Sequence, residues 1–203
     1  MRQTVIPTRA DHVDMPRDAV PILRTLTWGF LLCCLSSAQE QVLDLAGKSV
    51  DSFKASSGKL VVLVFIRTDC PISNRYAPTI QLLSAQYERQ AAFWLVYPDK
   101  AESPAAIQKY LSDYRYQLPA LRDPQHALVK RSLVQVTPEA AVFDSRGQLA
   151  YHGRIDNWYQ SFGRSRAAPT THELEDAIRA TLSGSRPEIT ASNGVGCYIS
   201  DLE

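Results

Sequence analysis

The sequence predicts an α/β fold with a central mixed β-sheet flanked by helices. Apolar runs rich in β-branched and aromatic residues at 59–66 and 93–97 alternate with helical segments, which is typical of parallel strands. A further pair of apolar runs, residues 140–143 and 148–151, is joined by the short polar segment Asp144-Ser145-Arg146-Gly147. This pattern indicates a hairpin, which adds antiparallel strands to the sheet.

The first elements lead to a buried strand and a helix. Residues 42–50 predict a short hairpin with a glycine turn, and residues 59–66 predict a buried strand that ends shortly before Cys70. Apolar side chains recur at helical spacing over residues 73–87, and Pro78 is expected to kink this helix. The predicted buried face comprises Tyr76, Ile80, Leu83 and Tyr87.

Three further helices have recognisable starts. Ser103-Pro104 and Asp123-Pro124 each supply an N-cap followed by proline, so a helix is expected to open at each pair. The last helix is expected to begin at the capping box Thr170-x-x-Glu173 and to stop at Gly184. Its predicted buried residues are Leu174, Ala177, Ile178 and Leu182.

Residues 1–38 are predicted to be a secretory signal peptide. Arginines precede the apolar stretch 26–35, and small residues follow it up to Ala38, after which cleavage is expected. The stretch is shorter than the roughly 20 apolar residues of a membrane span. Cleavage would also remove it, so no stable membrane span is expected in the mature chain. The acidic residues before Met15 are atypical of an export signal, and a start at Met15 gives a signal of ordinary shape.

The rest of the chain is expected to be exported to the periplasm or outside the cell, with residues 39–184 as one domain and 185–203 as a tail. The alternatives are an uncleaved anchor and a lipoprotein using Cys33 or Cys34, although Leu32 rather than a small residue precedes Cys33. Removal of the signal leaves equal numbers of basic and acidic side chains, which argues against nucleic-acid binding.

Two cysteines, Cys70 and Cys197, remain after cleavage, and such a pair in an exported protein favours redox chemistry or a disulfide over a metal site. Cys70 lies between a buried strand and a helix start, where the helix dipole and free N–H groups lower a thiol pKa. An inert buried thiol is the alternative. His126, His152 and His172 have no metal-ligand spacing, and no motif for an organic cofactor is present.

Three stretches carry a resemblance to a known family: residues 61–78, Val136-Thr137-Pro138 and residues 151–156. Together they resemble the thioredoxin-like redoxin family, of the alkyl hydroperoxide reductase and thiol-specific antioxidant type, over roughly residues 42–184. The resemblance implies a thioredoxin-like fold with Cys70 as the attacking cysteine. It also implies that Pro138, in the loop with Thr137, is a cis-proline that faces Cys70 and presents backbone to an extended substrate.

The chain departs from the family pattern at two places. Ser73 stands where thioredoxins have the second cysteine, which excludes local CxxC exchange. Arg67 stands where peroxiredoxins have a threonine, with Thr68 one residue nearer to the cysteine. Cys197, in a glycine-containing tail like those of similar redoxins, is then the candidate resolving thiol.

Two mechanisms follow for this pair. In the first, Cys70 reduces a peroxide, becomes a sulfenic acid and is then attacked by Cys197. In the second, Cys70 attacks a protein disulfide, and Cys197 releases the substrate from the mixed disulfide. Both need a reducing thiol partner. Arg75 and Arg67 are candidates to stabilise the thiolate or to polarise a peroxide oxygen, with a solvated surface position as the alternative. For Arg154 and Asp156 a structural ion pair is favoured over a role at the site.

Two alternatives to redox turnover remain open. A permanent Cys70–Cys197 disulfide is compatible with an exported protein. A non-catalytic binding module, in which the Pro138 loop holds a peptide, is the second, because fold alone does not decide function. The reactivity of Cys70 distinguishes the binding module from the enzyme.

Overall fold

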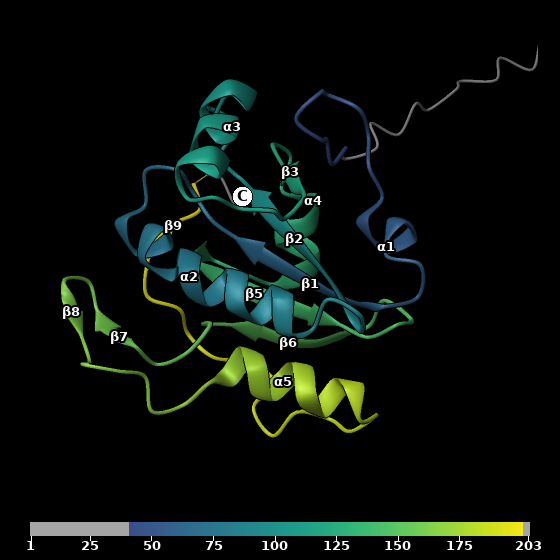
Figure 1. The fold of residues 1–203 in the computed structure, drawn as a ribbon, viewed down its shortest axis with the longest axis vertical. Helices are drawn as coiled ribbons and strands as arrows, with labels where there is room; N and C mark the ends of the chain where they lie inside the picture. Colours follow the sequence, from purple (N-terminus) through teal and green to yellow (C-terminus); the bar gives the residue numbers. More distant parts are fainter. Residues whose placement is uncertain (1–40, 201–203) are drawn as a thin grey trace, which may run out of the picture. The chain divides into compact units, whose positions relative to one another are not determined.

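A five-stranded mixed sheet lies at the centre of residues 41–200, the part of the chain that this computed structural model describes (Figure 1). The strand order is β3-β2-β1-β5-β6. β1, β2 and β3 run parallel to one another, whereas β5 runs antiparallel to both of its neighbours, β1 and β6. The strands are β1 (Leu60–Phe65), β2 (Ala91–Tyr97), β3 (Ala120–Arg122), β5 (Glu139–Phe143) and β6 (Leu149–Gly153). The predicted mixed sheet is confirmed, and β3 was not predicted. The predicted signal peptide lies outside the described residues.

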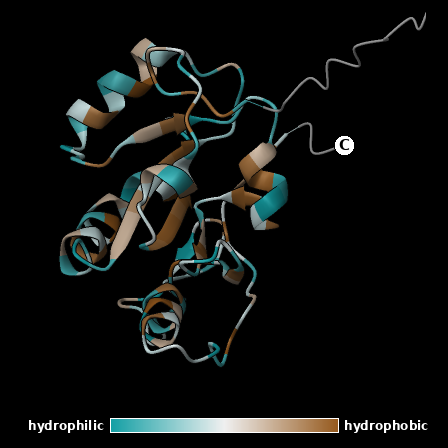
Figure 2. Ribbon diagram, turned by 90° about the vertical axis from the view of Figure 1, so that its right-hand side faces the viewer, coloured by the Kyte–Doolittle hydropathy of each residue, from teal (hydrophilic) through white to brown (hydrophobic). Residues whose placement is uncertain are grey.

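Helices cover both faces of this sheet. They are α1 (Ser52–Ala55), α2 (Pro71–Gln86), α3 (Pro104–Asp113), α4 (Ala127–Ser132) and α5 (Glu173–Leu182). Alternate residues of β1 point to opposite faces, so Val62 and Val64 pack with α2, α3 and α5, and Leu63 packs with α1 and α4. Figure 2 shows hydrophobic brown on the strands and mixed brown and teal on the helices, as expected for a buried sheet under amphipathic helices.

The helix after Cys70 begins earlier than predicted. α2 starts at Pro71 with Cys70 as its N-cap and runs through Pro78 to Gln86. All the side chains predicted to face the core are buried: Tyr76, Ile80, Leu83 and Tyr87. The predicted start of α3 is confirmed, since the Ser103 hydroxyl accepts a hydrogen bond from the Ala106 N–H.

The predicted start of α4 at Asp123-Pro124 is wrong. His126 takes a left-handed conformation, so the helix begins only at Ala127. The buried Asp123 carboxylate still accepts hydrogen bonds from the N–H groups of Leu128 and Val129, each at 2.9 Å. Asp123 therefore caps this helix from a turn that precedes it.

The predicted capping box of α5 is also wrong, whereas its end is confirmed. His172 is the N-cap, and the hydroxyl of Thr170 accepts from the Asn157 amide instead. At the other end Gly184 has a φ of +75°, as expected for a glycine that terminates a helix. Ile178 is fully buried, as are Leu174 and Ala177. Leu182 is 37% exposed, contrary to the prediction.

Short strand pairs lie outside the central sheet. β4 (Val136–Thr137) pairs with β9 (Cys197–Tyr198), and β7 (Tyr159–Ser161) pairs with β8 (Arg164–Ser165). The predicted hairpin at residues 42–50 is reduced to one antiparallel bridge between Leu43 and Ser49. Within residues 41–200, no helix has the length and apolar character needed to cross a membrane.

Candidate active site

Cys70 lies where the chain passes from β1 into α2. Its backbone is extended, its side chain is fully buried, and Pro71 occupies the first position of the helix. Proline there has no N–H to lose, while the next N–H groups of the first turn remain free to face the sulfur. The Ser73 N–H is one of these groups and interacts with the Cys70 sulfur. The predicted position of the thiol at a helix N-terminus is confirmed.

The environment lowers the pKa of Cys70. Burial acts to raise this pKa, but the N–H and hydroxyl of Ser73 and the thiol and N–H of Cys197 favour the thiolate and outweigh it. In the thiol form, Cys70 donates to the Thr137 carbonyl oxygen at 3.2 Å, a contact that favours the protonated state. The net direction is downward because the polar groups of Ser73 and Cys197 together outweigh burial.

The loop that faces Cys70 contains the cis-proline that the resemblance implied. The Thr137–Pro138 peptide bond is cis, and Thr137 is fully buried. This loop carries β4, which pairs antiparallel with β9 so that Thr137 lies opposite Cys197. The Thr137 hydroxyl also donates to the Cys197 carbonyl oxygen at 3.3 Å. The tail therefore folds back onto the proline loop, and Figure 1 shows the yellow β9 near the start of α2.

The two cysteine sulfurs meet at this point. The Cys197 thiol donates to the Cys70 sulfur at a sulfur–sulfur distance of 3.1 Å, and both cysteines are free. Burial raises the pKa of Cys197. The hydrogen bond to Cys70 and the negative charge of the Cys70 thiolate raise the pKa of Cys197 further. The pair therefore consists of Cys70, whose pKa is lowered, and Cys197, whose pKa is raised, in direct contact.

The structure does not bring Arg75 to the cysteines. Its guanidinium lies over the Trp158 ring, 5.4 Å from the ring centroid, and no hydrogen bond or ion pair joins Arg75 to either cysteine within residues 41–200. Arg67 is closer, since its charge lowers the pKa of Cys197. Its guanidinium is paired with Asp69 at 2.9 Å and Asp99 at 3.1 Å. Cys70, Cys197, Thr137 and Pro138 thus meet at one point, and Arg75 does not.

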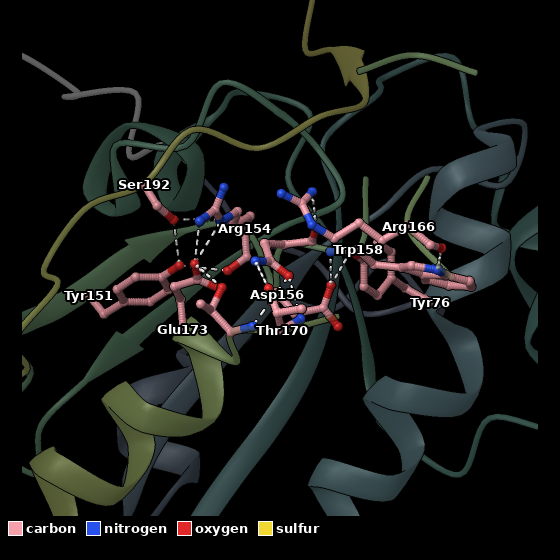
Figure 3. Close-up of polar contacts among 11 residues, drawn as sticks. Tyr76, Tyr151, Arg154, Asp156, Trp158, Arg166, Thr170, Glu173 and Ser192 are labelled. Atoms are coloured by element: carbon pink, nitrogen blue, oxygen red, sulfur yellow. Dashed lines mark hydrogen bonds and ion pairs between the residues drawn. The ribbon is translucent and has the colours of Figure 1, made fainter. Parts of the chain in front are cut away.

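Arg154 and Asp156 are structural, but they do not pair with each other. Arg154 forms an ion pair with the buried Glu173 (Figure 3). Asp156 accepts from the Tyr76 hydroxyl at 2.5 Å and from the Trp158 N–H at 2.8 Å. These contacts link the loop after β6 to α2 and α5, and so brace the helix that carries Cys70.

Tyrosine side chains line the interior beside the site. Burial is the main cause that raises the pKa of Tyr97, Tyr110 and Tyr116, and the charge of Cys70 contributes at Tyr110. Their hydroxyls stay protonated, so this wall carries no charge of its own at neutral pH. Among the described residues no group of three or more His, Cys, Asp or Glu side chains is placed to hold a metal ion.

Two further residues shape the site, and sequence analysis did not single them out. Glu139, directly after Pro138, is 5% exposed and bonds to the tail through the Gly194 N–H at 2.9 Å. Gly196 leaves no room for a side chain, because a Cβ there would lie 1.9 Å from the Thr137 carbonyl oxygen. The sequence held two signals for these residues. One is an acidic residue at the start of an apolar strand, and the other is the pair of glycines that flank Val195.

The comparisons with known proteins agree with this geometry. A family model described as AhpC/TSA family matches residues 36–152. An uncharacterized conserved protein from Geobacillus kaustophilus is 22% identical with a TM-score of 0.68, over 78% of this chain and 86% of its own. A hypothetical protein from Sinorhizobium meliloti is 20% identical with a TM-score of 0.66, over 78% and 88%.

A third solved structure is itself described as a thioredoxin. The pneumococcal exposed lipoprotein thioredoxin from Streptococcus pneumoniae is 22% identical with a TM-score of 0.51, over 71% of this chain and 97% of its own. These likenesses show a thioredoxin-like fold. A search among curated proteins returned no match.

Proposed function

Since the chain belongs to the AhpC/TSA family of thioredoxin-like redoxins, we propose that it is a thiol-disulfide oxidoreductase with Cys70 as nucleophile and Cys197 as resolving thiol. The observation that carries the proposal is the 3.1 Å contact between the two sulfurs. A lowered pKa at Cys70 and a donor thiol in contact with it are the two requirements of such a pair.

The reaction transfers two electrons in two displacements. The Cys70 thiolate attacks one sulfur of a substrate disulfide, and the other substrate sulfur leaves as a thiolate that takes a proton from solvent. Cys197 then loses its proton and attacks the Cys70 sulfur of the mixed disulfide. The Cys70–Cys197 bond forms, the bond to the substrate breaks, and the substrate leaves fully reduced. A reducing thiol partner regenerates the pair.

Charge sets the order of the two attacks. While Cys70 is a thiolate, its hydrogen bond and charge add to burial in raising the pKa of Cys197. Formation of the mixed disulfide removes that charge, so burial and the charge of Asp69 are left to oppose the ionisation of Cys197, while the charge of Arg67 favours it. Cys197 therefore becomes a better nucleophile at the step in which it is needed.

The surroundings favour a disulfide substrate over a peroxide. Arg75 lies over Trp158 and Arg67 is held by two aspartates. The two guanidinium groups that were candidates to polarise a peroxide oxygen are thus engaged elsewhere. Disulfide exchange needs only the two thiols and the donors at Ser73.

We also propose that the domain works outside the cytoplasm, after removal of residues 1–38. The short apolar stretch at 26–35 and the small residues up to Ala38 support this. Expression of the whole chain in a bacterial host, followed by fractionation and intact mass of the exported species, tests it. A periplasmic product beginning at Gln39 is expected, and a full-length cytoplasmic product would contradict export.

The proposed chemistry is tested by intact mass of reduced wild type, Cys70→Ser and Cys197→Ser. Each is mixed with oxidised glutathione or, separately, with one equivalent of hydrogen peroxide. We expect Cys197→Ser to accumulate one glutathione adduct, wild type to lose two hydrogens, and Cys70→Ser to stay unchanged. If hydrogen peroxide rapidly adds oxygen to Cys197→Ser while oxidised glutathione gives no adduct, the protein is a thiol peroxidase instead. Unreactive Cys70 in both series would make it a binding module.

A further inference from the structure

The Glu139 carboxylate joins the tail to the cis-proline loop. One oxygen accepts from the Gly194 N–H at 2.9 Å, and the other accepts from the N–H groups of Gln135 at 2.8 Å and Val136 at 3.3 Å. The side chain is 5% exposed. Hydrogen bonds to a buried carboxylate are about twice as strong as neutral ones, so this residue ties two backbone segments that are far apart in the chain.

The fit between Glu139 and the tail leaves no free space. A Cβ at Gly194 would lie 2.6 Å from the Glu139 Cγ and 2.8 Å from its Oε1. At Gly196 the Thr137 carbonyl blocks any side chain in the same way. The glycines on both sides of Val195 thus let the backbone approach the loop closely enough for the Glu139 contact.

The strand pairing beyond this contact is short. β4 and β9 contribute two residues each, and one further bond runs from the Ile199 N–H to the Gln135 carbonyl at 3.0 Å. A two-stranded ribbon of this length is marginal alone. The hydrogen bonds of the Glu139 carboxylate add to this short pairing and to the Thr137–Cys197 bond in holding the segment that carries Cys197 against the loop.

We propose that Glu139 is a positioning residue for the resolving step. By holding residues 194–198 on the cis-proline loop, it keeps the Cys197 sulfur at attacking distance from Cys70 and raises the effective concentration of that thiol. The inference rests on the proposed function. Glu139 touches neither sulfur, so it acts on the second displacement, in which Cys197 attacks the mixed disulfide, and leaves the first attack by Cys70 unchanged.

The test separates the two displacements in the exported chain. The first is the rate at which oxidised glutathione forms an adduct in Cys197→Ser, with and without Glu139→Gln. The second is the rate at which glutathione leaves Cys70 when Cys197 is present. In Glu139→Gln an amide NH₂ replaces one acceptor oxygen, so one side of the link is lost. We expect the second rate to fall by about tenfold or more, and the first to stay within about twofold.

Glu188→Gln is the matched control, because Glu188 is an exposed acid in the same tail, before the segment 194–198. We expect it to leave both rates unchanged. Amide hydrogen exchange gives a measurement that does not depend on the thiol reaction. We expect Glu139→Gln to raise the exchange rate at residues 194–198 and to leave the exchange rates in β1 and α5 unchanged.

Three outcomes would count against the inference. Equal slowing of both steps, with faster exchange throughout the sheet, would make Glu139 a general stabilising residue. An unchanged second rate beside a normal first step would overturn the positioning role alone. Failure of wild type and Cys197→Ser to form any adduct would overturn the proposed function, and this inference with it.

Discussion

The Cys197 sulfur lies 3.1 Å from the Cys70 sulfur, although 127 positions separate the two residues in the chain. Cys70 is fully buried, whereas Cys197 keeps part of its surface in solvent. The tail therefore covers the thiol that carries the lower pKa. Substitutions near this contact are expected to change the chemistry of the pair more than the stability of the sheet below it.

The pH dependence of the site should follow Cys70. Its pKa lies below the ordinary 9.0, so the thiolate fraction at neutral pH exceeds that of a free cysteine, and the adduct rate rises with pH through a midpoint below 9.0. Ser73→Ala removes the hydroxyl donor and should move the midpoint upward, while the exposed Ser145→Ala should not. Thiolate absorbance in the ultraviolet measures both. A wild-type midpoint at or above 9.0 would contradict the prediction.

Gly196→Ala should separate the two cysteines. The added Cβ would lie 1.9 Å from the Thr137 carbonyl oxygen, so the backbone of the tail must move away from β4. A displacement of this size is expected to slow closure of the Cys70–Cys197 disulfide by about a hundredfold. Intact mass over time after adduct formation gives the rate. The exposed Asn193→Ala serves as control, and equal closure rates in the two variants would refute the predicted clash.

Arg154→Leu should destabilise the domain in a pH-dependent way. Burial raises the pKa of Glu173, but Arg154 and Thr171 lower it more, so the folded pKa lies below 4.5. The ionised pair therefore stabilises the fold above pH 4.5, and the contribution is lost as pH falls through the folded pKa. Removing Arg154 leaves a carboxylate that is 2% exposed without its cation, at a cost of about 3 kcal/mol near neutral pH.

Denaturant unfolding near neutral pH and well below 4.5 checks this prediction. The loss should disappear at the lower pH, because both proteins then carry a protonated Glu173. Adding Glu173→Gln should restore part of the stability at neutral pH. A loss of the same size at both pH values would show that Arg154 acts by packing rather than by charge.

Two positions of α5 should differ sharply in their response to alanine. Ile178 is fully buried, so Ile178→Ala leaves a cavity and should cost about 3 kcal/mol of unfolding free energy. Leu182 is 37% exposed, and Leu182→Ala should cost less than about 1 kcal/mol. Thermal or denaturant unfolding measures both. Similar losses at the two sites would contradict the burial difference.

Local patterns were sufficient for the parts of the fold that depend on neighbours in the chain. The apolar run of β1 and the Ser103-Pro104 start of α3 were predictable, because strand burial and helix capping act over a few residues. The same holds for Gly184 at the end of α5 and for the position of Cys70 at a helix N-terminus. β3 escaped prediction because it has only three residues, of which only Leu121 is buried.

The sequence by itself determined that the chain has a thioredoxin-like sheet, a cysteine at the start of a helix at position 70 and a second cysteine in a glycine-containing tail. Only the tertiary structure decided which groups meet: Cys197 with Cys70, Glu139 with Gly194, and Arg75 with Trp158. These partners are more than 50 residues apart in the chain, and no local preference encodes their distance. Strand pairing and close packing bring them together, because a side chain finds its partner only after the backbone segments that carry both have docked.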